Sequence, residues 1–186
     1  RALNVERSLI QKISRNGWAS ISTDQRRGIA TPQPPSKGYT QSLTDIFSMH
    51  GNMYKKDAAP SEVDTKKLAS FIEAQTFWDR AMAEAITQAR TAGGNPLVVA
   101  IVGRGHVEYG YGISHQLADL GISNGAVLLP WDKELTCDGL KTSKGFPVAQ
   151  AVFGVDELPE QEKPYQPTLG VQIITASNGV RIIKVV

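Results

Sequence analysis

The sequence predicts an α/β fold, in which a largely parallel sheet is flanked by helices. Three observations lead to this prediction. Apolar, β-rich runs alternate with segments of helical period over the first 155 residues. The run LVVAIV at residues 97–102 lacks polar alternation, which is typical of a strand buried on both faces. A glycine-rich turn with a histidine follows it, at the strand end where α/β sheets open onto a ligand crevice.

The N-terminal half of the chain carries three predicted helices. Asn4 is a suitable N-cap for the first, and Gly17 is well placed to end it. Residues 22–38 form a polar segment with three prolines, which we interpret as an exposed loop that serves as a connector or a lid. A short helix follows at residues 39–50, ended by a glycine, and the longest helix covers residues 61–92.

The remaining elements of the main domain are short. The sequence predicts a helix at residues 113–120 and a strand at residues 126–129, which Pro130 ends. A further strand is expected at residues 148–155. Between the two strands the chain is polar and without a strong period.

Composition divides the chain into three parts. Residues 1–155 carry the α/β pattern, and residues 156–167 are rich in acids and prolines, as linkers are. Residues 168–186 contain two β-runs around Ser177, Asn178 and Gly179, a strong β-hairpin signal. We therefore expect a domain, a linker and a terminal hairpin.

Net charge, cysteine content and hydrophobicity exclude several classes of protein. A net charge of +2 with scattered basic residues gives no reason to expect a nucleic-acid partner. The single cysteine, Cys137, excludes an internal disulfide, and no apolar run is long enough to span a membrane. The chain begins at Arg1 without a visible targeting signal, so we expect it to be part of a longer protein.

The glycine-rich turn centres on His106. Gly103 and Gly105 echo a dinucleotide-binding fingerprint, but the third glycine and the opening helix are missing at residues 107–109. We interpret these glycines as allowing a sharp turn that exposes the imidazole. Three functional roles are open to His106: a ligand to a metal or haem iron, a general base, or a hydrogen-bonding partner of a bound ligand. The alternative is a structural role, in which the imidazole holds the loop in place.

Two tyrosines follow the histidine. Tyr109 and Tyr111 alternate with Gly110 and Gly112, which indicates that their rings project from a conformationally free backbone. A phenolate binds ferric iron, and an aromatic ring stacks on a porphyrin. Paired tyrosines are equally common as packing residues.

Polar residues interrupt the apolar face of the longest predicted helix. Gln75 and Asp79 lie one turn apart on that face, where a carboxylate is costly without a partner. Asp79 therefore bonds to backbone in the strand-end loop, or it orients His106 or a ligand. His50 and His115 are weaker candidates, which we expect to be surface or packing residues.

Two of these segments together resemble a known family. The stretches AQTFWDRAMAEAI (residues 74–86) and VVAIVGRGHVEYGYGI (residues 98–113) are similar to the ChaN-like haem-binding uptake family. This family belongs to a superfamily that includes the Tiki and TraB proteins and the erythromycin esterases. NVERSLIQKISRNGW (residues 4–18) is similar to the family's segment before the long loop, and the resemblance covers roughly residues 2–130.

The resemblance implies an α/β fold and a cell-envelope lipoprotein tied to iron or haem uptake. It also implies a haem or another small ligand held between aromatic and histidine side chains, at a dimer interface. The expected protein partner is a second copy of the chain or a larger assembly. The positions that match the family's site are His106, Gly103, Gly105, Tyr109, Tyr111, Gln75, Trp78 and Asp79. Of these, His106, Tyr109 and Tyr111 are the candidate iron ligands, and the resemblance does not assign one of the tyrosines.

The chain also departs from the family. The family usually begins with a strand and a Gly-Glu-x-His-like motif that contributes to the same cleft, and no segment here matches it. We therefore expect the cleft to need residues from outside this chain. The tail at residues 169–186 is similar to the opening strands of a PDZ domain, an appendage of some family members.

Three functions remain open at this point. The first is a haem-binding protein in which His106 and a nearby tyrosine face the porphyrin. The second is a hydrolase of the erythromycin-esterase or Tiki type, in which His106 activates water or holds a metal and Glu108, Asp79 or His50 assists. The third is a non-catalytic subunit that kept the fold. The resemblance favours a binding protein over an enzyme.

Overall fold

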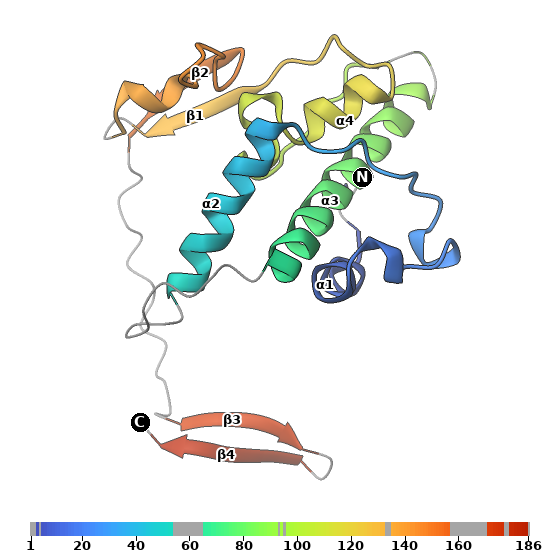
Figure 1. The fold of residues 1–186 in the computed structure, drawn as a ribbon, viewed down its shortest axis with the longest axis vertical. Helices are drawn as coiled ribbons and strands as arrows, with labels where there is room; N and C mark the ends of the chain where they lie inside the picture. The colour runs from blue at the N-terminus through green and yellow to red at the C-terminus, as the bar shows by residue number, and fades with distance from the viewer. Residues whose placement is uncertain are drawn as a thin grey trace. The chain divides into compact units, whose positions relative to one another are not determined.

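A computed structural model describes most of the chain (Figure 1). The described residues are 3, 5–53, 65–92, 94, 96–132, 135–156, 171–176 and 179–185. They fall into two compact units, residues 1–154 and residues 155–186, which are described separately.

The first unit combines helices with a small sheet. Its helices are α1 (Arg7–Asn16), α2 (Lys37–Met53), α3 (Thr65–Thr91) and α4 (Ile113–Asp119), and its strands are β1 (Leu128–Asp132) and β2 (Ala151–Val155). Short 3-10 turns lie at Trp18–Ser20, Asp24–Arg26, Arg104–His106, Glu108–Gly110 and Cys137–Leu140. Strands β1 and β2 pair in parallel and are flanked by helices, which confirms the α/β class (Figure 1).

Helix α1 forms because its apolar residues fall on one face. Leu9, Ile10 and Ile13 are buried and pack against Ala74 and Phe77 of α3. Burial of that face, rather than capping, stabilises the helix, since its N-cap position, Glu6, makes no side-chain capping bond.

The predicted end of α1 is confirmed and its predicted start is wrong. Gly17 adopts a φ of +79°, and its amide donates to the carbonyl of Ile13 at 2.7 Å. The helix begins at Arg7, so Asn4, which lies outside the described residues, is not its cap.

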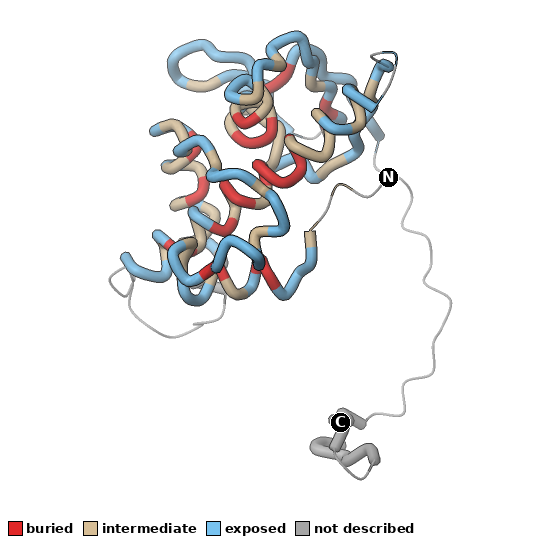
Figure 2. The backbone as a smooth tube through the Cα atoms, turned by 90° about the vertical axis from the view of Figure 1, so that its right-hand side faces the viewer, coloured by how far each residue is buried: buried red, intermediate tan, exposed pale blue. Residues whose placement is uncertain are grey.

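Helix α3 lies at the centre of the first unit, in contact with α1, α2 and α4. Buried positions recur along the helices where they face one another (Figure 2). Farther along α3, Met82 and Ala83 pack against Ile113 of α4. Arg80 is buried between these contacts and joins α3 to α4 through an ion pair with Asp119 at 2.5 Å.

The predicted central strand is wrong in the structure. Residues 97–102 form no regular secondary structure, and they belong to neither sheet of the described residues. Leu97 and Ile101 are 92% and 94% exposed, whereas Val102 packs against the α3–α4 contact. An apolar run becomes a buried strand only where neighbouring strands pair with it and cover it, and the described residues provide no such neighbour.

Two predicted boundaries also differ. Pro130 lies inside β1 instead of ending it. Proline is tolerated there because a strand of a two-stranded sheet has an edge that needs no amide donor. Helix α2 continues past Gly51 to Met53, since glycine permits helical geometry although it does not favour it.

The second unit holds a β-hairpin, as predicted. Strands β3 (Val171–Ala176) and β4 (Gly179–Val185) pair antiparallel, with an irregularity between Gln172 and Ile173. Most of the predicted linker, residues 157–167, lies outside the described residues. A hairpin by itself does not establish the PDZ-like segment, so that expectation is not confirmed.

The proline-rich segment before α2 is held in place by α4. Gln116, which is almost fully buried, accepts a hydrogen bond from the amide of Gln33 at 2.9 Å and donates one to its carbonyl at 2.8 Å. The imidazole of His115 lies 2.9 Å from the carbonyl of Pro34. These contacts set where α2 begins. Among the described residues, no helix is long and apolar enough to cross a membrane.

We predict that Gln116→Leu destabilises the first unit by about 1–3 kcal/mol, because it leaves both backbone groups of Gln33 without their partner. Urea unfolding measures this change. The matched control is Gln41→Leu, which removes an exposed side-chain contact to Asp45 and should stay within about 0.5 kcal/mol. Equal effects of the two substitutions would contradict the role of Gln116.

Candidate functional site

A buried carboxylate organises the candidate site. Asp79 of α3 is 0% exposed, and each of its two oxygens has a partner. Oδ1 lies 2.7 Å from Nδ1 of His106, and Oδ2 accepts a hydrogen bond from the hydroxyl of Tyr39 at 2.6 Å. Of the partners expected for Asp79, the structure shows His106 rather than backbone of the loop.

The local environment decides which groups donate. Burial raises the pKa of Tyr39, and the charge of Asp79 raises it further, so the phenol keeps its proton and donates. The pKa of Asp79 is raised above its ordinary value, because the effect of burial outweighs that of the hydrogen bonds from His106 and Tyr39, which lower it. An ionised carboxylate only accepts hydrogen bonds, so beside it Nδ1 of His106 is the donor, and in the neutral imidazole Nε2 is then the acceptor.

His106 presents its outer edge to the surface. Its side chain is 17% exposed, and no described residue forms a hydrogen bond with Nε2. Trp78, the neighbour of Asp79 on α3, meets the imidazole edge-on with ring centroids 5.1 Å apart. Gln75 is half-buried one turn earlier on α3. The structure therefore brings His106, Trp78 and Asp79 together.

A glycine that the sequence analysis did not single out for its size, Gly112, makes this close approach possible. A Cβ on Gly112 would lie 2.5 Å from the carbonyl oxygen of His106 and 2.9 Å from Oδ1 of Asp79. By contrast, a Cβ on Gly103 would come no closer than 3.6 Å to His106, and one on Gly105 would meet open space. The steric need for glycine thus lies after the histidine turn.

Tyr109 points away from His106 into the β1–β2 region. Its hydroxyl donates to the carbonyl of Gly139 at 2.8 Å, and its ring packs against the cluster around Trp131. Burial raises the pKa of the Tyr109 hydroxyl, and the charge of Glu108 raises it further, which disfavours a phenolate.

Tyr111 lies between the other two tyrosines. Its ring centroid is 6.0 Å from that of Tyr39 and 5.4 Å from that of Tyr109. Its hydroxyl packs closely over Gly38, where a Cβ would come within 2.5 Å of it. The two predicted tyrosines therefore join a third, Tyr39, in an aromatic row beside the carboxylate.

Sequence reasoning missed Tyr39. The residue begins a predicted amphipathic helix and resembles any buried aromatic residue in the sequence pattern. One signal was available: a carboxylate buried on a helix face requires a donor for each oxygen, and a tyrosine on the apolar face of a neighbouring helix provides one.

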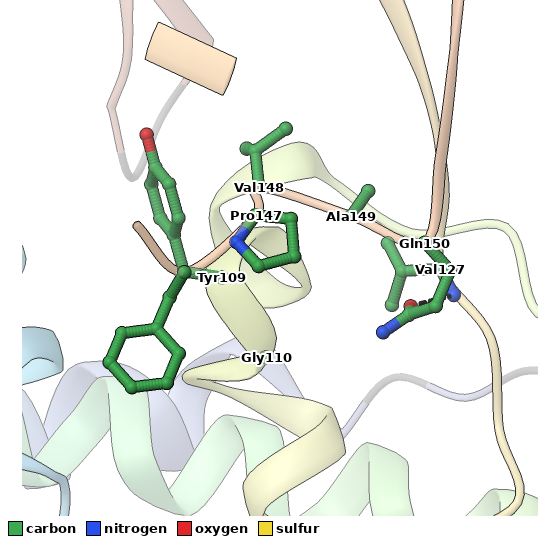
Figure 3. Close-up of a pocket in the computed structure, with 8 residues that line it drawn as sticks. Tyr109, Gly110, Val127, Pro147, Val148, Ala149 and Gln150 are labelled. Atoms are coloured by element: carbon green, nitrogen blue, oxygen red, sulfur yellow. Dashed lines mark hydrogen bonds between the residues drawn. The ribbon is translucent and has the colours of Figure 1, made fainter. Parts of the chain in front are cut away.

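A small cavity lies near the site but apart from His106. It has a volume of about 200 Å³, and Tyr109 and Gly110 line one side, with Val127 and the segment 146–150 around the rest (Figure 3). The amide of Val127 donates to Gln150 at its margin (Figure 3). Because pockets for drug-sized ligands measure roughly 300–1,000 Å³, this cavity does not enclose a porphyrin.

The other candidate residues lie elsewhere. His115 contacts the proline-rich segment, Cys137 is exposed, and the side chain of His50 lies outside the described residues. Among the described residues, no three His, Cys, Asp or Glu side chains gather to hold a metal ion.

Comparison with known proteins assigns the family. Residues 1–117 match the model of a family described as "Haem-binding uptake, Tiki superfamily, ChaN". The chain belongs to this family, and the matched range includes Tyr39, Asp79 and His106. Neither a curated protein nor a solved structure matches the chain.

We predict that Gly112→Ala disrupts the contact between Asp79 and His106, because the added Cβ meets the His106 backbone and the Asp79 carboxylate at once. We expect a loss of about 1–3 kcal/mol in the free energy of unfolding, with changed NMR signals of the His106 ring. Gly125→Ala is the control, since a Cβ there meets open space. Unchanged His106 signals in Gly112→Ala would show that the site tolerates a Cβ.

Proposed function

We propose that this protein binds haem, with Nε2 of His106 as the group that faces the iron, and that it acts in iron or haem uptake. Family membership supports a haem-related role in general. The observation that carries the specific proposal is the contact between Asp79 and His106, which leaves Nε2 available on the exposed side of the ring.

The residues present fit a haem site in which His106 would hold the iron. A histidine that ligates a metal almost always donates its other ring hydrogen to a carboxylate, a carbonyl or water, and Asp79 provides a carboxylate at 2.7 Å. Haem iron accepts histidine as an axial ligand in several protein classes. When bound, the haem would supply an iron centre with Lewis-acid and redox chemistry.

The chain's own residues orient and shield this ligand. Trp78 contacts the edge of the imidazole and limits its rotation. Asp79 holds Nδ1, and burial of that carboxylate excludes water from the contact.

The tyrosines have a different part in this proposal. The hydroxyl of Tyr109 is engaged by Gly139 and its raised pKa disfavours the phenolate, so we place His106 before it as the iron ligand. Tyr111 contributes an aromatic surface beside the site. A cell-envelope location and a site shared between two copies of the chain belong to the same proposal and rest on the family alone.

A second function has one specific observation in its favour. A buried carboxylate that holds a histidine through Nδ1 is also the arrangement of a general base. His106 would accept a proton from water through Nε2 while the water oxygen attacks the carbonyl carbon of an ester. The acyl C–O bond would then break, and the imidazolium would give the proton to the departing alkoxide, leaving an acid and an alcohol.

We predict that haemin added to the full-length protein that contains this chain gives a Soret band characteristic of histidine ligation, and that His106→Ala loses or shifts it. Asp79→Asn should weaken haemin binding by about 10- to 100-fold, the range typical of residues that support a metal ligand. Absorbance titration measures both effects. His115→Ala is the matched control because this histidine lies against the proline-rich segment. A Soret band that is absent, or identical in His106→Ala, would refute the proposal.

The hydrolase alternative predicts a different result. The chain would hydrolyse an activated ester such as p-nitrophenyl acetate, His106→Ala would reduce the rate by about 100-fold or more, and EDTA would leave it unchanged. Release of nitrophenolate measures the rate. A rate that does not depend on His106 would exclude this function.

A further inference from the structure

We propose that Tyr39 is a positioning residue for His106, acting through Asp79 to select the side of the imidazole that is offered to a ligand. The inference rests on the proposed function in one respect, namely that the ligand meets Nε2. It adds a residue from a different helix to the site.

The three side chains form a continuous set of short contacts. The hydroxyl of Tyr39 lies 2.6 Å from Oδ2 of Asp79, and Oδ1 of the same carboxylate lies 2.7 Å from Nδ1 of His106. Tyr39 is 3% exposed and Asp79 is 0% exposed, so water does not replace either contact at low cost.

The phenol matters because a carboxylate held at one oxygen still rotates. With donors at both oxygens, the carboxylate plane is set and Oδ1 accepts the hydrogen of Nδ1. Loss of the Tyr39 hydroxyl would leave Oδ2 buried without a partner, and the carboxylate would turn to share its remaining donor. The carboxylate would then favour one imidazole tautomer over the other less strongly.

Several contacts hold Tyr39 in this position. Its amide donates to the hydroxyl of Ser36 at 3.2 Å, which caps α2. The preceding segment is bound to Gln116 of α4 in both directions. The ring of Tyr111 lies beside that of Tyr39. The phenol is therefore placed by α2 and α4, although the carboxylate and the imidazole lie on α3 and its facing turn.

A purely structural role would have another signature. If Tyr39 only filled space, Tyr39→Phe would keep the ring, lower stability slightly and leave His106 as it was. If Tyr39 positions His106, the same substitution changes the protonated nitrogen of the imidazole even where the fold is intact.

The experiment is NMR of histidine ring nitrogens in the ligand-free 186-residue chain labelled with ¹⁵N. We expect wild-type His106 to carry its hydrogen on Nδ1, and Tyr39→Phe to show a mixture of the two tautomers. The control is Thr44→Val, which removes a hydroxyl hydrogen bond on the same helix without touching Asp79. A double-mutant cycle with Asp79→Asn tests whether Tyr39 acts on His106 through Asp79, because Tyr39→Phe should have no further effect when Asp79 is replaced.

Haem binding gives the second readout. We expect Tyr39→Phe to weaken haemin binding about 3- to 10-fold, the effect of one net hydrogen bond, and to do so only while Asp79 is present. Identical His106 nitrogen shifts in wild type and Tyr39→Phe would overturn the inference. If wild type binds no haemin, the proposed function fails while the nitrogen shifts still decide the role of Tyr39.

If Tyr39→Phe does not fold, a measurement on the wild-type protein still tests the inference. The Tyr39 hydroxyl hydrogen and the His106 Nδ1 hydrogen should both exchange slowly with water, because both lie on a buried carboxylate. Rapid exchange of the Tyr39 hydroxyl would overturn the inference without any substitution.

Discussion

The burial of one carboxyl group constrains how three segments of this structure meet. The carboxylate of Asp79 is fully covered, and burying an ionised group costs several kcal/mol unless hydrogen bonds and charge compensate it. Its compensation comes from Tyr39 on α2 and His106 on the turn before α4. Three segments that are distant in sequence must therefore meet at one point of α3 for the charge to be tolerated.

The same helix shows how the fold supports that meeting. Arg80, which follows Asp79 directly, forms an ion pair with Glu84 on α3 itself and joins α3 to Asp119 of α4. Phe77, two residues before Asp79, packs against α1. Polar and apolar contacts thus alternate along α3 and hold its neighbours on different sides. Gly112 completes the arrangement because the backbone of His106 and the carboxylate leave no room for a side chain there.

Family membership and site geometry support the functional proposal in different ways. The family points to haem uptake, and the geometry shows that Asp79 holds Nδ1 of His106, which is why we propose Nε2 as the nitrogen that meets a ligand. The same carboxylate–imidazole contact suits an axial ligand and a general base, because both uses need Nδ1 held and Nε2 available. What distinguishes them is the partner at Nε2. In the proposal, the indole ring of Trp78 beside the imidazole suits a flat, apolar ligand better than a water molecule.

The sequence by itself determined the helices, the hairpin, the histidine turn and the importance of Asp79. These follow from local rules: helical spacing, the turn-forming residues around Asn178, and the cost of a carboxylate on an apolar face. Only the tertiary structure decided that residues 97–102 form no strand, that the glycine requirement lies at Gly112, and that Tyr39 holds the second oxygen of Asp79. Each of these depends on which distant segments come into contact, and neither spacing nor composition encodes a contact between residues 40 positions apart.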